Sequence, residues 1–146
     1  MELAQFLPYR LSVLSNVVSN AISEYYADRF NLSISGWRVI ALLAQKPGST
    51  AVDLASMTQM DKVAISRAVS SLVQMGYIER EPCTIDRRRA YLTLTDKGIE
   101  IYNDIVPVAQ SYEEKLLASL SETKRKQLDN LIAELQCNAN TLTKSV

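Results

Sequence analysis

The sequence contains no histidine and only two cysteines, Cys83 and Cys137. Without an imidazole, a catalytic triad built on histidine is excluded and zinc lacks its commonest nitrogen ligand. The two cysteines are far apart in the sequence, which fits neither a disulfide framework nor a metal-binding spacing. No nucleophile–base pair and no glycine-rich phosphate loop is present. We therefore expect no enzymatic activity, no metal and no cofactor.

Long apolar runs and low-complexity stretches are also missing. No run of about 18 apolar residues occurs, so we predict no membrane span. The N-terminus has no basic segment followed by an apolar core, so we predict no signal peptide and a cytoplasmic location. The chain has 146 residues with only 4 glycines and 4 prolines, and 47% of its residues are hydrophobic. This composition predicts one globular domain, or one compact domain with an added dimerisation element.

The chain has no excess of charge of either sign, because 16 basic residues balance 16 acidic ones. A neutral chain is at first an argument against nucleic-acid binding. The distribution matters more than the sum, because Arg87, Arg88 and Arg89 are consecutive. Such a local basic projection can bind phosphate on a chain that is neutral overall.

The periodicity of apolar residues predicts a mostly α-helical protein with one small β-hairpin. A long first helix has an apolar stripe at helical spacing, typical of a helix that packs against other helices: Leu7, Leu11, Leu14, Val18, Ala21 and Tyr25. We predict that Ser35 caps a second helix that runs to about residue 45. A short third helix is expected to be capped by Ser49 or Thr50 and to bury three side chains, Val52, Leu54 and Ala55.

A fourth helix is predicted over residues 61–75, with Asp61 as its N-cap and Gly76 as its terminating residue. Strands over residues 77–81 and 89–94 then form a hairpin with a charged loop at its tip. Thr95 is expected to cap a fifth helix, and Ser121 begins a final helix. The third and fourth helices form a helix-turn-helix pattern.

The predicted fourth helix has two distinct faces. A rotation of about 100° per residue places four apolar side chains on the core side: Ile65, Val69, Leu72 and Val73. The opposite face carries slim or flexible side chains: Val63, Ser66, Arg67, Ser70 and Gln74. Such a face fits the major groove of DNA, where arginine can pair with guanine and valine can touch a thymine methyl group. The alternative is an ordinary solvated helix face.

Three consecutive arginines at a hairpin tip repel one another in a bare surface loop. The negative potential of a narrow minor groove offsets that repulsion. We predict that Asp86 braces one guanidinium through a bidentate pair and thereby fixes its direction. The alternative is a solvated turn with local ion pairs.

Residues 86–98 carry a more specific pattern, in which Asp86 and Arg88 are followed by Leu94, Thr95 and Gly98. This segment resembles the wing signature of the MarR family, Asp-x-Arg followed by Leu-Thr-x-x-Gly. Residues 59–80 also resemble that family's recognition helix and the strand after it, and the element order matches over nearly the whole chain.

The resemblance implies a winged helix-turn-helix regulator of transcription that binds double-stranded DNA. Arg88 would enter the minor groove and Asp86 would position it. The residues that would approach the major groove and backbone are Lys62, Val63, Ser66, Arg67 and Ser70. Residues 35–98 would form the DNA-binding lobe, while residues 1–34 and 99–146 would form a homodimer interface. A symmetric dimer predicts an inverted-repeat operator with half-sites about one helical turn apart.

The resemblance also implies a small effector, often an aromatic or phenolic anion, that releases a repressor from DNA. Candidate wall residues combine aromatic rings with arginines: Tyr9, Arg10, Tyr25, Tyr26, Trp37, Arg38 and Tyr112. The alternative is that these aromatic residues belong to the core.

Other interpretations remain open at this point. The switch could be oxidation of Cys83 or Cys137, or the regulator could respond to no ligand at all. A winged-helix module that binds proteins instead of DNA is also compatible with the pattern. The sequence does not distinguish a repressor from an activator.

Overall fold

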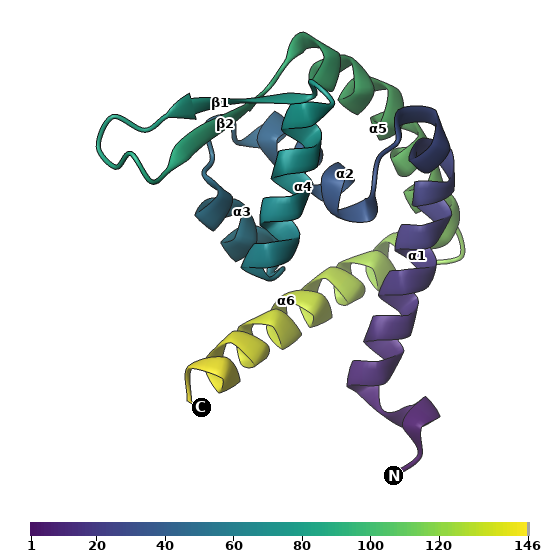
Figure 1. The fold of residues 1–146 in the computed structure, drawn as a ribbon. Coiled ribbons are helices and arrows are strands. Elements are labelled where there is room, and N and C mark those ends of the chain that lie inside the picture. Colours follow the sequence, from purple (N-terminus) through teal and green to yellow (C-terminus); the bar gives the residue numbers. More distant parts are fainter. Residues whose placement is uncertain (146) are drawn as a thin grey trace. The chain divides into compact units, whose positions relative to one another are not determined.

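The computed structural model describes residues 1–145, which divide into two compact units, Met1–Ala109 and a second that begins at Gln110. The predicted element order is confirmed (Figure 1): α1 Leu7–Phe30, α2 Ile34–Gln45, α3 Ala51–Thr58, α4 Lys62–Gln74, β1 Ile78–Pro82, β2 Ala90–Leu94, α5 Asp96–Leu117 and α6 Glu122–Lys144. The two strands pair antiparallel, with Arg80 opposite Leu92. The mostly helical winged-helix fold predicted from the sequence is therefore confirmed.

Local signals set most helix boundaries where the sequence placed them. The Asp61 carboxylate accepts a hydrogen bond from the Ala64 N–H at 2.8 Å and so begins α4. Thr50 and Asp53 form a reciprocal capping box at the start of α3, with hydrogen bonds of 3.2 and 2.9 Å. Such pairs satisfy N–H groups that the first helical turn cannot bond internally.

The predicted cap of α2 is wrong by two residues. Asn31 ends α1 in the left-handed conformation, with φ of 52°, and Leu32 then turns into the core. The next residue, Ser33, is extended and accepts a hydrogen bond from the Gly36 N–H at 2.9 Å. Ser33 is therefore the N-cap, and Ser35 lies inside the first turn of the helix.

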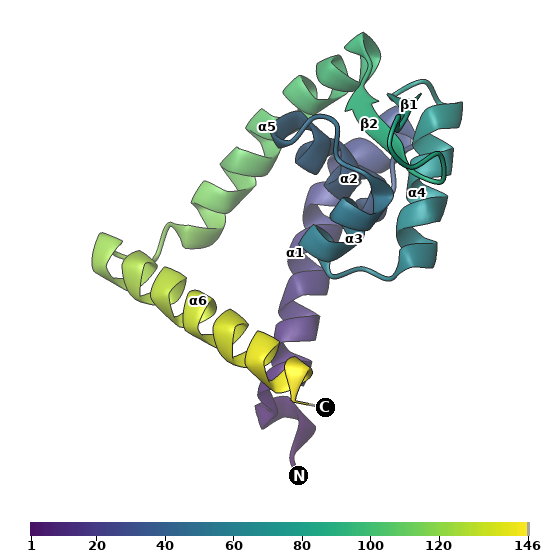
Figure 2. The same ribbon diagram turned by 90° about the vertical axis from the view of Figure 1, so that its left-hand side faces the viewer.

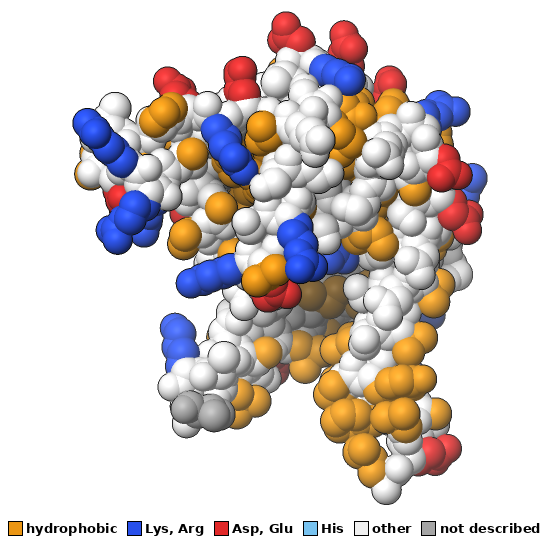
Figure 3. Space-filling view, viewed as in Figure 1, with side chains coloured by type: hydrophobic (Ala, Val, Ile, Leu, Met, Phe, Trp, Pro, Cys, Tyr) orange, Lys and Arg blue, Asp and Glu red, His pale blue; other side chains and the backbone are white. Residues whose placement is uncertain are grey.

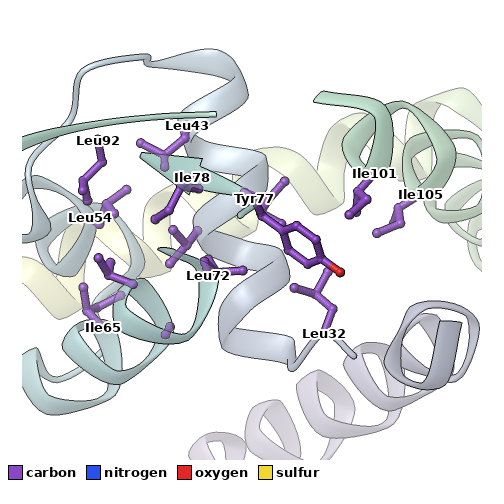
Figure 4. Close-up of a cluster of buried hydrophobic side chains, with 14 of the residues drawn as sticks. Leu32, Leu43, Leu54, Ile65, Leu72, Tyr77, Ile78, Leu92, Ile101 and Ile105 are labelled. Atoms are coloured by element: carbon purple, nitrogen blue, oxygen red, sulfur yellow. The ribbon is translucent and has the colours of Figure 1, made fainter. Parts of the chain in front are cut away.

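The core of the first unit holds α2, α3, α4 and the hairpin together. Figure 4 shows Leu43, Leu54, Ile65, Leu72, Ile78 and Leu92 gathered between these elements, and each is almost fully buried. Figures 1 and 2 show α4 beside α3 and next to the hairpin. One predicted core residue of α3 is wrong: Val52 is 49% exposed, because this short helix turns Leu54 toward the core and Val52 toward the surface.

The junction between α4, the hairpin and α5 explains the threonine and glycine of the Leu-Thr-x-x-Gly pattern. The Thr95 hydroxyl donates to the Gly76 carbonyl at 2.6 Å and accepts from the Gly98 N–H at 3.2 Å. A Cβ atom on Gly98 would collide with the backbone carbonyl of Tyr77. Only glycine therefore lets the first turn of α5 lie against the segment that joins α4 to β1.

The α1 helix of the first unit leaves a large apolar surface uncovered. Its N-terminal half exposes between 42% and 57% of several aliphatic side chains: Leu7, Leu11, Val13, Leu14 and Val17. Figure 3 shows these hydrophobic side chains as a continuous patch over the N-terminal part of the helix. Contiguous apolar surface of this kind is typical of an interaction site.

In the second unit, Ser121 caps α6 as predicted, by accepting from the Lys124 N–H at 3.2 Å. The Arg125 guanidinium donates to the carbonyl of Leu117, the last residue of α5, at 2.8 Å and to that of Leu120, in the following turn, at 3.1 Å. The α6 helix also exposes aliphatic side chains along its length: Leu128, Leu131, Ile132, Leu135 and Leu142. Within residues 1–145, no helix has the length and apolar character needed to cross a membrane.

Candidate nucleic-acid interface

The outward face of α4 presents the residues that the sequence assigned to it. Ile65, Val69 and Leu72 face the core, with exposed fractions of 1%, 3% and 0%. The predicted DNA-facing side chains are all exposed: Lys62, Val63, Ser66, Arg67, Ser70 and Gln74. Val63, at 59% exposed, is an apolar group left in water at the start of the helix. The face is thus mostly polar and exposed to solvent.

The loop between the strands is organised around Asp86. Its Oδ1 atom accepts from the backbone N–H of Arg88 at 3.0 Å and from Arg88 Nε at 3.2 Å. Its Oδ2 atom lies 3.8 Å from Arg89 Nε. The hydrogen bonds from Arg88 hold the pKa of the Asp86 carboxyl below its ordinary value. The carboxylate therefore stays charged and fixes the loop that carries the arginines.

This arrangement corrects the predicted bidentate pair. Asp86 does not bind one guanidinium through two parallel bonds, because one of its oxygens is shared between the backbone and side chain of Arg88 and the other faces Arg89. The Arg88 side chain is 92% exposed despite its contact with Asp86. The guanidinium is thus held at its base while its outer edge is free to bind an acceptor.

Cys83 lies at the base of the same loop and is 6% exposed. Its Sγ atom donates to the Tyr91 hydroxyl at 3.2 Å, and its backbone N–H donates to the Arg89 carbonyl at 3.2 Å. The thiolate form would instead accept hydrogen bonds, first from the Tyr91 hydroxyl and then from the backbone N–H groups of Asp86 and Ile85, and these bonds lower the pKa of the Cys83 thiol. The second cysteine, Cys137, lies exposed on α6. The thiol of Cys83 thus helps to pack the base of the hairpin.

One basic residue of this surface was missed by the sequence analysis. Arg80 of β1 lines a hollow of about 330 Å³ together with Ser66 of α4 and the arginines of the loop. The available signal was strand alternation, because Arg80 is two residues after the buried Ile78 and so lies on the same face of β1.

The predicted effector residues do not form one group in the first unit. Tyr9 and Arg10 share an open, largely apolar hollow of about 390 Å³ on α1 with Val13, Leu14 and Val17. Arg38 is exposed and donates to Ser19 Oγ at 3.3 Å. Tyr112 belongs to the second unit.

The remaining candidates pack with other side chains. The Trp37 ring stacks on Tyr102 of α5 with 6.0 Å between ring centroids and lies equally far from Tyr26 of α1. Burial raises the pKa of Tyr26. Tyr25 accepts a hydrogen bond from Arg29 at 3.0 Å, and that guanidinium also lies over the Tyr25 ring. These aromatic residues therefore join α1, α2 and α5.

Comparisons with known proteins agree with the geometry. A sequence profile of the MarR family matches residues 30–89. The HTH-type transcriptional regulator BilQ of Clostridium symbiosum is 34% identical over 96 residues, which cover 66% of this chain and 67% of BilQ. The chain belongs to the MarR family.

Further matches extend this relationship to the whole chain. The homoprotocatechuate degradative operon repressor of Escherichia coli is 25% identical over 113 residues, covering 77% of this chain and 76% of the repressor. A MarR/EmrR family transcriptional regulator from Acinetobacter sp. ADP1 is 25% identical in sequence, and its crystal structure superimposes with a TM-score of 0.87. The superposition covers 97% of this chain and 99% of the Acinetobacter chain. As a MarR-family transcriptional regulator, the protein binds DNA through its winged-helix fold.

Proposed function

We propose that the protein binds operator DNA as a homodimer, with α4 in the major groove and the β1–β2 loop in the adjacent minor groove. One observation supports this placement above all. The polar face of α4 and the Arg88 side chain belong to the same unit, and one buried core makes that unit rigid. The Arg88 side chain is 92% exposed and is held by Asp86. Two adjacent grooves of a duplex are the ligand that fits a helix and a basic projection side by side.

The side chains of α4 would make different kinds of contact with the DNA. Arg67 has the reach and the donors to pair with guanine, and Gln74 can pair with adenine. Val63 can contact a thymine methyl group, while Lys62, Ser66 and Ser70 can bind base edges or phosphates. In the minor groove, Arg88 would be attracted by the negative potential of a narrow, A·T-rich segment. Arg87 and Arg89 would bind the DNA backbone on either side.

The dimer would be built from residues 1–34 and 99–146, which leaves residues 35–98 as the DNA-binding lobe. The exposed aliphatic side chains of α1 and those of α6 would each leave water in such an interface. A symmetric pair of lobes requires an inverted repeat, with half-sites about one helical turn apart. Because its ligand is genomic DNA, we place the protein in the cytoplasm.

We further propose that it is a repressor released by a small aromatic or phenolic acid. A relative that represses an operon for the degradation of homoprotocatechuate, a phenolic acid, provides the precedent. The hollow beside Tyr9 and Arg10 offers an aromatic ring and a cation near the apolar surface of α1. A ligand acts as a switch only if it prefers one separation of the two lobes over another.

Selection from a random duplex library tests the DNA-binding part of the proposal. We expect enrichment of an inverted repeat whose half-sites are separated by about one helical turn. Failure to enrich any sequence would reject sequence-specific binding. Enrichment of a single, unrepeated site would reject the symmetric dimer on DNA.

A thermal-shift series of aromatic acids tests the effector. A true effector raises the melting temperature and releases the selected duplex. The Arg10→Gln variant should lose both responses to a ligand bound in the hollow on α1. A compound that stabilises the protein without releasing DNA would contradict the switching mechanism.

A further inference from the structure

Arg80 of β1 points toward α4, away from the acidic residues of its own strand. It shares a strand face with Ile78, which is 2% exposed and packs into the core, while Glu79 and Glu81 alternate onto the opposite face. The Arg80 Nη2 atom lies 3.4 Å from Ser70 Oγ on α4 and donates to it. The guanidinium therefore lies between the outward face of α4 and the hairpin.

The hollow at this position is lined by cations from two parts of the fold. Arg80 lines it from β1, and the loop adds Arg87, Arg88 and Arg89, with Ser66 on the α4 side. Both ion pairs found among residues 1–145 use Asp86, with Arg88 and Arg89. Arg80 and Arg87 thus have no carboxylate partner within that part of the chain. Figure 3 shows basic side chains over the loop and around α4, and acidic ones along the opposite edge of the hairpin.

The duplex itself supplies the missing anion. The major and minor grooves are separated by a sugar–phosphate strand. If α4 lies in the major groove and the loop lies in the minor groove, that strand must pass between them. The hollow that contains Arg80 occupies this position, because it is bounded by α4 on one side and the loop on the other.

We propose that Arg80 binds a backbone phosphate of the DNA strand that passes between α4 and the loop. This inference rests on the proposed function and adds a contact to it. The hydrogen bond to Ser70 holds the guanidinium toward this strand. A guanidinium offers two parallel N–H groups to a phosphate and so binds it with defined geometry. Phosphates carry no sequence information, so Arg80 contributes affinity for any duplex and fixes the register of α4.

The test measures binding to a labelled duplex of mixed sequence by fluorescence anisotropy over a range of salt concentrations. At about 0.1 M salt, Arg80→Gln should bind about eightfold more weakly per DNA-binding lobe than the wild type, if the two bind equally at about 1 M salt, because each phosphate contact adds about 0.9 to the salt slope. The slope of log affinity against log salt should become shallower by about 0.9 per DNA-binding lobe. Arg80→Lys, which keeps the charge, should retain most of the slope. Arg29→Gln, an exposed arginine of α1, is the matched control and should bind as the wild type does.

The outcomes separate the inference from the proposed function. If the wild type binds no duplex, the proposed function fails. If the wild type binds and Arg80→Gln keeps the wild-type slope, Arg80 does not contact phosphate, whatever the change in affinity. Melting curves show whether each variant is folded, and Arg80→Ala repeats the measurement with a second neutral side chain. A loss of slope in both neutral variants, with recovery in Arg80→Lys, supports the phosphate contact.

Discussion

The Asp86 carboxylate holds Arg88 at two points, its backbone N–H at 3.0 Å and its Nε at 3.2 Å. The contact is local, two residues apart, and it fixes the backbone of the loop together with the first part of the guanidinium. The rest of that guanidinium is exposed to solvent. An acidic residue therefore lies at the centre of a surface that we propose binds a polyanion, and its role there is to orient a cation.

The Asp86→Ala variant tests whether Asp86 acts by orienting Arg88 or only through its negative charge. Removal of a negative charge from a DNA-binding surface should raise affinity if only long-range electrostatics matter. Because Asp86 positions Arg88 through charge-assisted hydrogen bonds, we expect the opposite on the selected operator, a loss of affinity. Affinity for a mixed-sequence duplex should stay the same or rise. A gel-shift titration on both duplexes measures the two effects.

The matched control for this experiment is Glu81→Ala, which removes a negative charge from the face of β1 opposite Arg80. That variant should bind the operator as tightly as the wild type or more tightly. An Asp86→Ala variant that behaves like Glu81→Ala would show that Asp86 does not position Arg88.

The Arg67→Ala variant tests base reading by α4. Loss of a bidentate contact to guanine should cost about 1–3 kcal/mol on the operator and relax the preference at one base pair. Binding to a mixed-sequence duplex should change much less. Competition titrations against single-base variants of the operator provide the measurement. Equal losses on both kinds of duplex would make Arg67 a phosphate contact.

The capping box at α3 predicts a pH dependence of stability. The hydrogen bond from the Thr50 N–H lowers the pKa of the Asp53 carboxyl. A carboxyl whose pKa is lower in the folded state stabilises the fold above its unfolded pKa, about 4, and loses this effect as the pH falls through the folded value. Asp53→Ala should therefore lower the melting temperature by a few degrees at neutral pH. The difference from the wild type should shrink below about pH 4.

Melting curves between pH 2 and 7 test this dependence, with Asp28→Ala on the exposed side of α1 as the control for a lost carboxylate. A difference in melting temperature between Asp53→Ala and the wild type that stays constant across this range would show that the charge of Asp53 does not stabilise the helix.

The apolar surface of α1 predicts a dimer that a single charge can break. Leu14 is 56% exposed in the single chain. Burial of an unpaired glutamate at this position would carry a desolvation cost, so Leu14→Glu should shift the protein toward monomers. Sedimentation velocity measures the change. Gln45→Glu adds the same charge on an exposed part of α2 and should leave the oligomeric state unaltered; a monomeric wild type would refute the proposed interface.

Periodicity and capping residues carried most of the fold prediction. Asp61, Gly76 and Ser121 were correctly predicted to bound helices, because caps act through bonds to residues three or four positions away. Ser35 was wrongly preferred to Ser33, because both residues are serine, which favours the N-cap position, and only the backbone path after Asn31 shows that Ser33 is the extended residue. Val52 was misplaced because one turn of a short helix has too few apolar residues to define its buried side.

The candidate site was predictable where it depends on one element and unpredictable where it depends on several. The exposed face of α4 followed from helical geometry alone. The sharing of Asp86 between Arg88 and Arg89 depends on the backbone path of the loop, which the sequence does not reveal. Arg80 meets Ser70 across ten positions of chain, and only the packing of β1 on α4 brings them together.

The placement of the β1–β2 loop in the minor groove is best tested by comparing wild-type and Arg88→Ala protein for binding to the selected operator across a range of salt concentrations. We expect the variant to bind at least about tenfold more weakly and to have a salt slope that is shallower by about 0.9 per DNA-binding lobe. An Arg88→Ala protein with the affinity and the salt slope of the wild type would contradict the placement of this loop in the minor groove.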